Sequence, residues 1–369
     1  MIKSILFYVS VVFIILITAI VIFINTAPQF GGNPSQSQKN YYKTLSNYHD
    51  NGFETIQKTP MMTGQISTWD FLMVDSSRFP DTAIVPTKIN YSVFKEIQGQ
   101  AYKIAWLGHS GFIMNISGEI ILLDPMLGSH AAPVPIPQLK RYTEIIPIKP
   151  ESISEVDVVL FSHDHYDHLD HSTIKSIKEN VKNFVVPLGV GNHLKRWGVD
   201  ENQITELNWN DSFKLNDVEY VCLTARHFSG RGPLNRNSTL WSSWAIKSKF
   251  VKIYFSGDSG YGDHYKSIGD KHGPFDISLL DCGQYNRAWK FSHMFPPEAV
   301  LAAKDLNTDF FIPIHWAGFT LAMHPWDEPV KEAIKFADKL GLKYLTPQIG
   351  EIVTQETLSK SRDQWWMKY

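Results

Sequence analysis

The hydrophobic pattern of the chain begins with one long apolar run. Residues 5–24 form an uncharged stretch of 20 residues, which is long enough for a helix to cross a bilayer. A cleavable signal peptide has a shorter apolar region of roughly 7 to 15 residues. The pattern therefore predicts an uncleaved membrane anchor over residues 1–25, with a buried helix as the alternative.

Charges beside this run predict its orientation. Lys3 precedes it, and the next basic residue is Lys39. Basic residues favour the cytoplasmic side of a membrane span. We therefore expect a single-pass membrane protein whose main domain lies outside the cytoplasm.

Polar and mixed segments follow the anchor. Residues 29–40 are rich in Gly, Ser, Asn, Gln and Pro, a composition typical of flexible linkers, so we expect a tether over residues 26–40. Residues 41–98 mix polar and apolar pieces, and we expect them to form a lead-in or cap packed on the main domain. The main domain is expected over residues 99–369.

Short apolar runs alternate with helical patterns from residue 101 onwards. Strands are predicted where β-branched and aromatic residues cluster between turn signals; they are expected at 101–107, 112–116, 120–123, 156–161, 184–187, 218–224, 241–247, 251–256, 277–280 and 310–314. Helices are predicted at 169–178, 193–197, 297–307 and 329–340, the last ended by Gly341. This order of strands and helices indicates an α/β fold.

The candidate chemistry gathers at the turn after the strand at 156–161. There the chain reads His163-x-His165-x-Asp167-His168. Imidazole and carboxylate groups suit zinc, and a tight turn can aim such side chains at one or two ions. The alternative is a solvated, histidine-rich surface loop.

Three further candidate ligands occupy similar places in the pattern. His227, Asp258 and His315 each follow the end of an apolar strand, and side chains at strand ends can converge at one edge of a sheet. The ligand set then suffices for two ions. We expect one ion on His163, His165 and His227, the other on Asp167, His168 and His315, and Asp258 bridging both.

A site with two zinc ions predicts hydrolysis. Zinc lowers the pKa of bound water from about 15.7 to about 7, so hydroxide is available at neutral pH. Two zinc ions also outweigh the charge of two carboxylates and one hydroxide, which suits an anionic phosphodiester. Tyr166 is a candidate for contact with the substrate, with packing as the alternative.

Composition narrows the class of protein. A net charge of -2 argues against a nucleic-acid-binding protein. Cys222 and Cys282 are too few for a disulfide framework and have apolar neighbours, so we expect buried free thiols. Oligomeric state is not predicted by the sequence.

The chain resembles the metallo-β-lactamase superfamily and, more narrowly, the N-acyl-phosphatidylethanolamine-hydrolysing phospholipase D group. The metal motif and its three distant partners carry the broader resemblance. Other matching stretches are Gly108-His109, Leu123-Asp124-Pro125, Pro187-Leu188-Gly189, Leu240-Trp241-Ser242-Ser243-Trp244, Gly257-Asp258-Ser259-Gly260-Tyr261, Gly273-Pro274-Phe275-Asp276 and Ile314-His315-Trp316. The Trp stretches and Gly273-Pro274-Phe275-Asp276 indicate the narrower group.

The resemblance implies an αβ/βα sandwich of two β-sheets flanked by helices, with two zinc ions. It also implies hydrolysis of an N-acyl-phosphatidylethanolamine-like phospholipid to phosphatidic acid and a free head group. His293 is implied as a residue that helps the leaving group, so that Asp258 and His293 are the candidate catalytic residues. The position beside His293 carries Ser292 where the group has Gln, which leaves the head group open.

Two other functions remain open from the sequence. A dizinc hydrolase of a lactone or an amide would use the same ligands. A membrane-anchored protein could also bind a metal for structural reasons and catalyse nothing. Structural zinc sites are usually closed by four protein ligands, whereas the ligand set here leaves room for a bridging water, which argues against this function.

Overall fold

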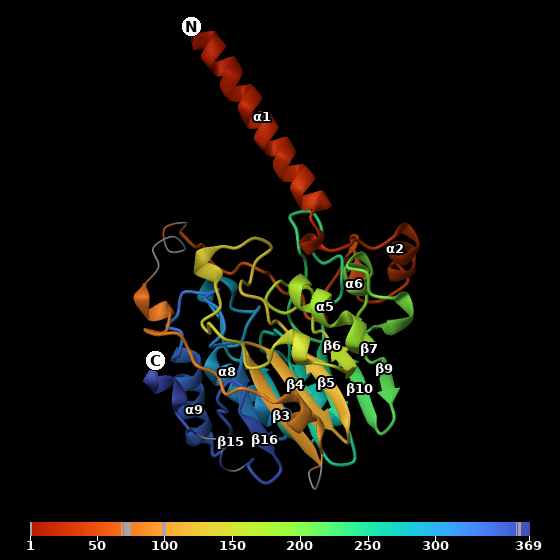
Figure 1. The fold of residues 1–369 in the computed structure, drawn as a ribbon, viewed down its shortest axis with the longest axis vertical. Coiled ribbons are helices and arrows are strands. Elements are labelled where there is room, and N and C mark those ends of the chain that lie inside the picture. Colours follow the sequence, from red (N-terminus) through yellow and green to blue (C-terminus); the bar gives the residue numbers. More distant parts are fainter. Residues whose placement is uncertain (1, 68, 70–74, 98–100, 359, 361–362) are drawn as a thin grey trace.

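Two seven-stranded β-sheets lie face to face in the computed structural model of the protein (Figure 1). The structure describes residues 2–67, 69, 75–97, 101–358, 360 and 363–369. The expected boundary between the lead-in segment and the main domain, at residues 98 and 99, lies outside these residues.

The first sheet is built mainly from the first half of the domain. Its strands, in spatial order, are β16 (Ile352–Thr354), β3 (Tyr102–Gly108), β4 (Gly111–Ile116), β5 (Glu119–Leu123), β6 (Val156–Leu160), β7 (Val181–Pro187) and β8 (Ile204–Leu207). The second sheet has the order β15 (Lys343–Tyr344), β14 (Thr308–Ile314), β13 (Phe275–Asp281), β12 (Lys252–Phe255), β11 (Ser243–Lys247), β10 (Val218–Leu223) and β9 (Ser212–Leu215).

The two sheets share one strand pattern. In the first, β3, β4 and β5 pair antiparallel, and β5 to β8 pair parallel. In the second, β10, β11 and β12 pair antiparallel, and β12 to β15 pair parallel. Strands that occupy the same place in the two sheets therefore end at equivalent positions of their sheets.

Helices cover the outer face of each sheet. The described helices are α1 (Ile2–Thr26), α2 (Gln36–Tyr42), α4 (Tyr91–Lys95), α5 (His171–Ile177), α6 (Gly191–Arg196), α7 (His264–His272), α8 (Pro296–Asp305) and α9 (Glu328–Leu340). Helices α4, α5 and α6 share a buried apolar cluster with the first sheet. Helices α7, α8 and α9 share another with the second sheet.

The central core lies between the sheets. Alternate residues of the strands point inward, so Phe112 and Met114 of β4 meet Tyr220 and Trp244 of the second sheet in one buried cluster. Burying such side chains supplies most of the stabilisation of a fold of this kind. The four layers confirm the expected αβ/βα sandwich.

The expected elements occur with small shifts in their ends. The helix after the metal motif starts at His171 rather than 169, because the Asp170 side chain accepts hydrogen bonds from the backbone N–H groups of Ser172 and Thr173 and caps it. Helix α7 and the short strands β8, β9, β15 and β16 were not expected. Cys222 and Cys282 are buried free thiols, as expected.

Helix α1 projects away from the sandwich (Figure 1). It is long and apolar enough to cross a membrane, and none of its side chains is buried. The length and composition of α1 agree equally with a membrane anchor and with a signal sequence.

The segment after α1 differs from the expected flexible tether. The Arg196 guanidinium donates to the carbonyls of Thr26 and Gly31, and the Trp197 indole donates to that of Pro28. Ser35 then starts helix α2 with a capping box. The composition suggested mobility, but donors from distant parts of the chain hold the backbone of this segment.

The lead-in residues also contribute to the domain core. Tyr42, Tyr48 and Phe53 join the central cluster, with Tyr48 and Phe53 on the small hairpin of β1 (Tyr48–His49) and β2 (Gly52–Phe53). Phe94 of α4 joins the outer cluster of the first sheet. These contacts wrap the segment around the sandwich rather than leaving it as a separate lid.

Candidate metal centre

The loop from His163 to His168 follows the buried strand β6 and is fixed at several points. Asp124, at the end of the neighbouring strand β5, accepts hydrogen bonds from the Ser162 backbone N–H at 2.7 Å and from His168 Nδ1 at 2.6 Å. Because Nδ1 of His168 is engaged, its Nε2 is the atom that faces the site. A carboxylate that orients a histidine in this way also raises its basicity.

A buried carboxylate and a buried guanidinium hold the other side of the loop. Asp164 accepts from Gly230 N–H at 2.7 Å, from Thr239 Oγ1 at 3.0 Å and from His193 Nε2 at 3.1 Å. Arg231 donates to the carbonyls of Asp164 and Leu169. The loop is therefore held by groups that do not belong to the candidate ligand set.

One group of four side chains gathers around the middle of this loop. His163 Nε2 lies 2.8 Å from His165 Nδ1, which lies 3.3 Å from His227 Nε2. Asp258 Oδ2 lies 3.7 Å from His163 Nε2 and 3.6 Å from His227 Nε2. The His227 ring is oriented by its Nδ1–H, which donates to the Ser292 carbonyl at 2.9 Å.

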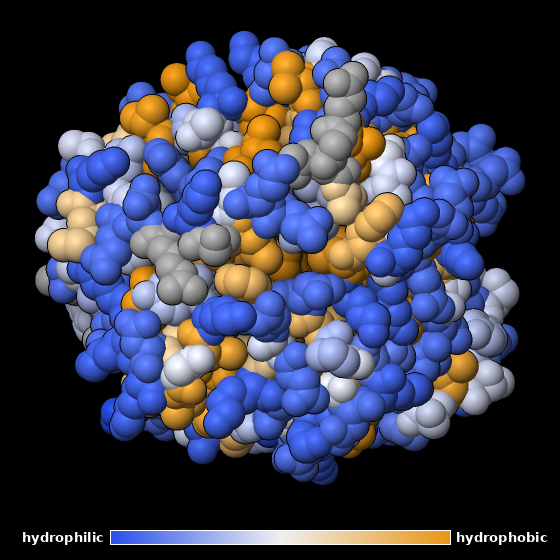
Figure 2. Space-filling view, turned by 90° about the horizontal axis from the view of Figure 1, so that it is seen from below, coloured by the Kyte–Doolittle hydropathy of each residue, from blue (hydrophilic) through white to orange (hydrophobic). Residues whose placement is uncertain are grey.

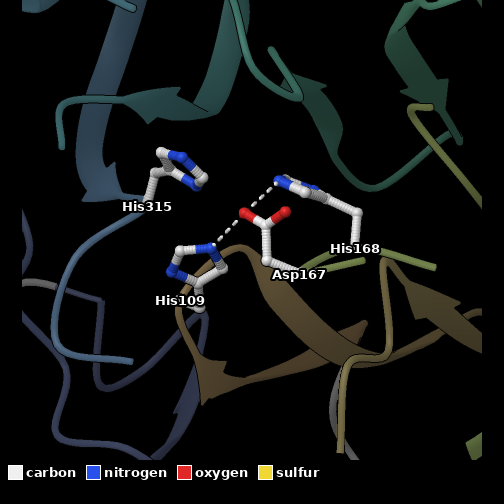
Figure 3. A group of neighbouring side chains, drawn as sticks. All are labelled: His109, Asp167, His168 and His315. Carbon is white, nitrogen blue, oxygen red and sulfur yellow. Dashed lines mark hydrogen bonds and ion pairs between the residues drawn. The ribbon is translucent and has the colours of Figure 1, made fainter. Parts of the chain in front are cut away.

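A second group lies beside the first and is shown in Figure 3. His168 Nε2 lies 3.3 Å from Asp167 Oδ2. His109 Nε2 donates to the same Asp167 oxygen at 2.8 Å. His315 faces the group from the end of β14.

Asp258 touches both groups. Its Oδ1 lies 3.1 Å from His168 Nε2 and 3.2 Å from His315 Nδ1, while its Oδ2 faces the first group. The structure thus brings all seven expected ligands together, in the two sets expected, with Asp258 between them. His109 is an addition to the second set.

Three of these imidazoles are in the chemical state that a bound cation requires. Burial lowers the pKa of His163, His227 and His315 well below the ordinary value, so these imidazoles are neutral and offer lone pairs. His168 Nε2 and Asp258 Oδ1 are buried and make no hydrogen bond of good geometry with the residues described. Buried polar atoms whose hydrogen bonds are poorly formed are costly, and divalent ions would satisfy them.

His293 lies next to both ligand groups. Its Nδ1 donates to Asp281 Oδ2 at 2.9 Å, and its ring stacks on His315 with centroids 5.0 Å apart. Burial by itself disfavours the charged ring, but the Asp281 carboxylate outweighs it and raises the pKa of His293 above the ordinary value. Asp281 is the last residue of β13 and had not been expected at the site.

The site opens into a cavity of about 280 Å³ with a largely apolar wall. The apolar side chains that line the cavity are those of Met61, Met62, Phe228, Trp289 and Leu321. Its floor is formed by the metal-ligand candidates and His293. The two methionines belong to the lead-in segment. An apolar cavity above a polar floor is typical of sites for amphipathic ligands.

Tyr166 does not line this cavity. Its hydroxyl donates to the Arg231 carbonyl at 2.6 Å, the Arg231 guanidinium lies 4.0 Å from its ring centroid, and Phe30 packs edge-on against it. The structure therefore places Tyr166 in a packing role, because alternate residues of the loop point to opposite sides. The Trp residues 241, 244, 316 and 326 are buried in the core.

The sequence named His109 without fixing its partner, and the partnerships of Asp281 and Arg231 were missed. His109 follows β3 in Gly108-His109-Ser110-Gly111, and its strand-end position was the available signal. Asp281 carried a weaker signal, an acid at the end of an apolar run. Arg231 lies in a loop without a pattern, so nothing local pointed to it.

This arrangement defines a metal-dependent hydrolase: a four-layer sandwich with two buried ligand groups at one edge. Comparisons with known proteins agree. A family model described as "Beta-lactamase superfamily domain" matches residues 119–316. The solved metallo hydrolase Igni18 from Ignicoccus hospitalis superposes with a TM-score of 0.51 at 21% identity, covering 69% of this chain and 97% of that chain.

Relatives in sequence narrow the family. An uncharacterised protein of Mycobacterium tuberculosis is 37% identical over 331 residues, which cover 87% of each chain. The N-acyl-phosphatidylethanolamine-hydrolyzing phospholipase D 1 of Caenorhabditis elegans is 34% identical over 266 residues, covering 67% of this chain and 74% of that protein. The chain belongs to the metallo-β-lactamase superfamily, in its group similar to N-acyl-phosphatidylethanolamine-hydrolysing phospholipase D, and is a hydrolytic enzyme.

The bridging position of Asp258 gives a test of the centre. We expect Asp258→Asn to lower the bound metal of the purified protein by at least about tenfold, because the neutral amide removes the charge shared by both ligand groups. Inductively coupled plasma mass spectrometry measures the metal per chain. Asp338→Asn, at an exposed position of α9, is the matched control, and equal metal in both variants would contradict the bridging role.

Proposed function

We propose that the protein is a phosphodiesterase of phospholipase D type, with two zinc ions, that hydrolyses an N-acyl-phosphatidylethanolamine-like lipid to phosphatidic acid and a free head group. The observation that carries the proposal is the pair of ligand groups sharing Asp258 at the floor of an apolar cavity. The printed activity of the Caenorhabditis elegans relative supports the same substrate class.

The spacing of the first ligand group suits zinc. Zinc–nitrogen bonds of about 2.0 to 2.1 Å in a tetrahedron put neighbouring ligand atoms roughly 3.3 Å apart. The four ligand atoms of His163, His165, His227 and Asp258 lie 2.8 to 3.7 Å apart along the contacts described above. Asp167, His168 and His315, with Asp258, are the candidates to hold a second ion.

When bound, divalent ions neutralise phosphate charge and lower the pKa of water. The protein residues do the rest. The apolar wall of the cavity faces the acyl chains, while the buried imidazoles and Asp258 would hold the ions that bind the phosphodiester. In the reaction a water oxygen bonds to phosphorus, the bond from phosphorus to the head-group oxygen breaks, and that oxygen takes up a proton.

His293 is the residue that we propose as the donor of this proton. Asp281 accepts from Nδ1 of His293, which leaves Nε2 as the atom that exchanges a proton with the leaving group. The nearby Asp281 carboxylate favours the protonated ring. General acid catalysis of this kind contributes about 10²- to 10⁴-fold to a rate.

A two-substrate assay tests the reaction class. The purified full-length protein, loaded with zinc, is offered an N-acyl-phosphatidylethanolamine and, separately, a lactone with the same acyl chain, in water enriched in oxygen-18. We expect phosphatidic acid that carries the heavy isotope in its phosphate, and an unlabelled N-acylethanolamine, by mass spectrometry. Turnover of the lactone alone would instead support the lactonase or amidase alternative.

A substitution tests the role of His293. We expect His293→Gln to lower kcat by about 10²-fold or more, because the proton donor is lost, with the metal content unchanged. His49→Gln, at an exposed position, is the control and should retain full activity. Loss of metal from the His293 variant would show a ligand rather than a proton donor, and undiminished kcat would exclude both roles.

We further propose that α1 is a single-pass anchor and that the sandwich lies outside the cytoplasm. Support comes from the length of α1, from its exposed apolar surface and from Lys3 in its first turn. Because both native cysteines are buried, a single introduced cysteine reports its own location. In intact bacterial spheroplasts, a membrane-impermeant maleimide should label Phe250→Cys in the domain and spare Ser4→Cys until lysis; the reverse would contradict the orientation.

A further inference from the structure

A second cavity, of about 390 Å³, lies where α1 meets the sandwich. It is bounded by the last turn of α1, by the segment that follows α1 and by the loop at 232–238. Its lining includes the three basic residues Lys39, Arg196 and Arg236 and no carboxylate. The cavity is therefore positively charged, although the whole chain has a net charge of -2.

Two of the three cations are available to a ligand. Arg196 is occupied, because it donates to the backbone carbonyls of Asn25, Thr26 and Gly31. Lys39 and Arg236 form no ion pair with any carboxylate in the part of the chain that the structure describes. Arg236 instead stacks on Phe228, its guanidinium 5.1 Å from the ring centroid.

Apolar side chains stand exposed around the same junction. Leu234 lines the cavity and is 95% exposed, and its loop reaches α1, since a Cβ on Gly232 would lie 4.0 Å from Ile24 Cγ2. A second loop adjoins the foot of α1 through a hydrogen bond from Gln29 Nε2 to the Pro133 carbonyl at 3.0 Å. That loop exposes Val134 and Ile136.

The opposite end of the molecule has a different surface. Figure 2, seen from the end away from α1, shows a face that is mainly hydrophilic, with scattered hydrophobic groups. At the foot of α1, exposed apolar residues lie next to cations that form no ion pair. This combination matches the boundary between the acyl chains and the head groups of a bilayer.

The length of α1 sets the depth of this junction. Its 25 residues span about 38 Å, more than the roughly 30 Å of a hydrocarbon core. With α1 across a bilayer, its last turn lies at the head-group level, and so do the cavity and the two loops that touch it.

We propose that the foot of α1 is a phospholipid-binding surface. Leu234 inserts at the acyl boundary, and Lys39 and Arg236 hold the phosphate of an anionic glycerophospholipid in the 390 Å³ cavity. This rests on the proposed membrane anchor but not on the proposed reaction. Because Arg236 stacks on Phe228 and Phe228 lines the metal cavity, the bound lipid lies beside that cavity.

Spin labels measure whether the loop enters the membrane. The full chain is placed in phosphatidylcholine and phosphatidylglycerol nanodiscs, with a nitroxide on a cysteine at position 234, 250 or 12; the buried native thiols do not react. Phe250→Cys, at an exposed position between β11 and β12, is the aqueous control, and Val12→Cys within α1 is the membrane reference.

The label at 234 should be accessible to oxygen and shielded from a water-soluble nickel complex, as at 12, and the label at 250 should show the opposite. A label at 234 that behaves like the one at 250, with 12 shielded, would overturn the lipid surface and leave the anchor intact. A water-accessible label at 12 would overturn both.

Lipid retention tests the two cations. Native mass spectrometry of the detergent-solubilised full chain, titrated with phosphatidylglycerol, gives an apparent affinity. Removing both charges with Lys39→Gln and Arg236→Gln should weaken retention by roughly tenfold or more. The control, Lys249→Gln with Lys252→Gln, removes two charges at the other end of the strands and should match the unmodified protein.

Equal retention by both double variants would overturn the phosphate site. Titration with inorganic phosphate distinguishes the source of the ligand, because saturation by free phosphate in place of lipid would contradict a membrane surface. None of these readouts depends on hydrolysis or on bound metal, so failure of the proposed reaction leaves them interpretable.

Discussion

The Asp258 carboxylate lies between two groups of imidazoles, and their arrangement depends on it. One oxygen is within 3.2 Å of ring nitrogens of His168 and His315, and the other faces His163 and His227. Burial raises the pKa of Asp258 to about 6, against the opposing effect of His168. Burying an ionised carboxylate without a counter-charge costs free energy. Divalent ions would supply the positive charge that stabilises it.

Close approach of two loops makes this contact possible. Gly257, just before Asp258, has a φ of +55°, and a Cβ there would lie 2.5 Å from the Ser162 side chain. A larger residue would separate the loop after β12 from the loop after β6. The same region is held from the far side by hydrogen bonds of Arg231 and Asp164, which lie outside the candidate ligand set.

The repeated strand pattern explains why the ligands meet. Corresponding strands of the two halves end at the same edge, so His109 after β3 corresponds to His227 after β10, and Asp124 after β5 to Asp258 after β12. The loop with the histidine motif follows β6, and the corresponding strand β13 ends at Asp281, which orients His293. The first half supplies the loop with most of the candidate ligands, while the second supplies Asp258, which lies between the two groups, and His293. The same edge receives α1, which relates the hydrolytic site to the proposed membrane surface.

The sequence by itself determined the elements and most of the ligand set. Hydrophobic periodicity is a local property, so the main strands, helices α8 and α9, the apolar run of α1 and the motif from His163 to His168 were predictable. His227, Asp258 and His315 were predictable because each follows an apolar strand. Only the tertiary structure decided that His109 and Asp281 orient site residues, that Tyr166 packs on Arg231, and that the segment after α1 is held in place. Those contacts join residues far apart in the sequence, and strand order and loop direction, which no local pattern encodes, bring them within hydrogen-bonding distance.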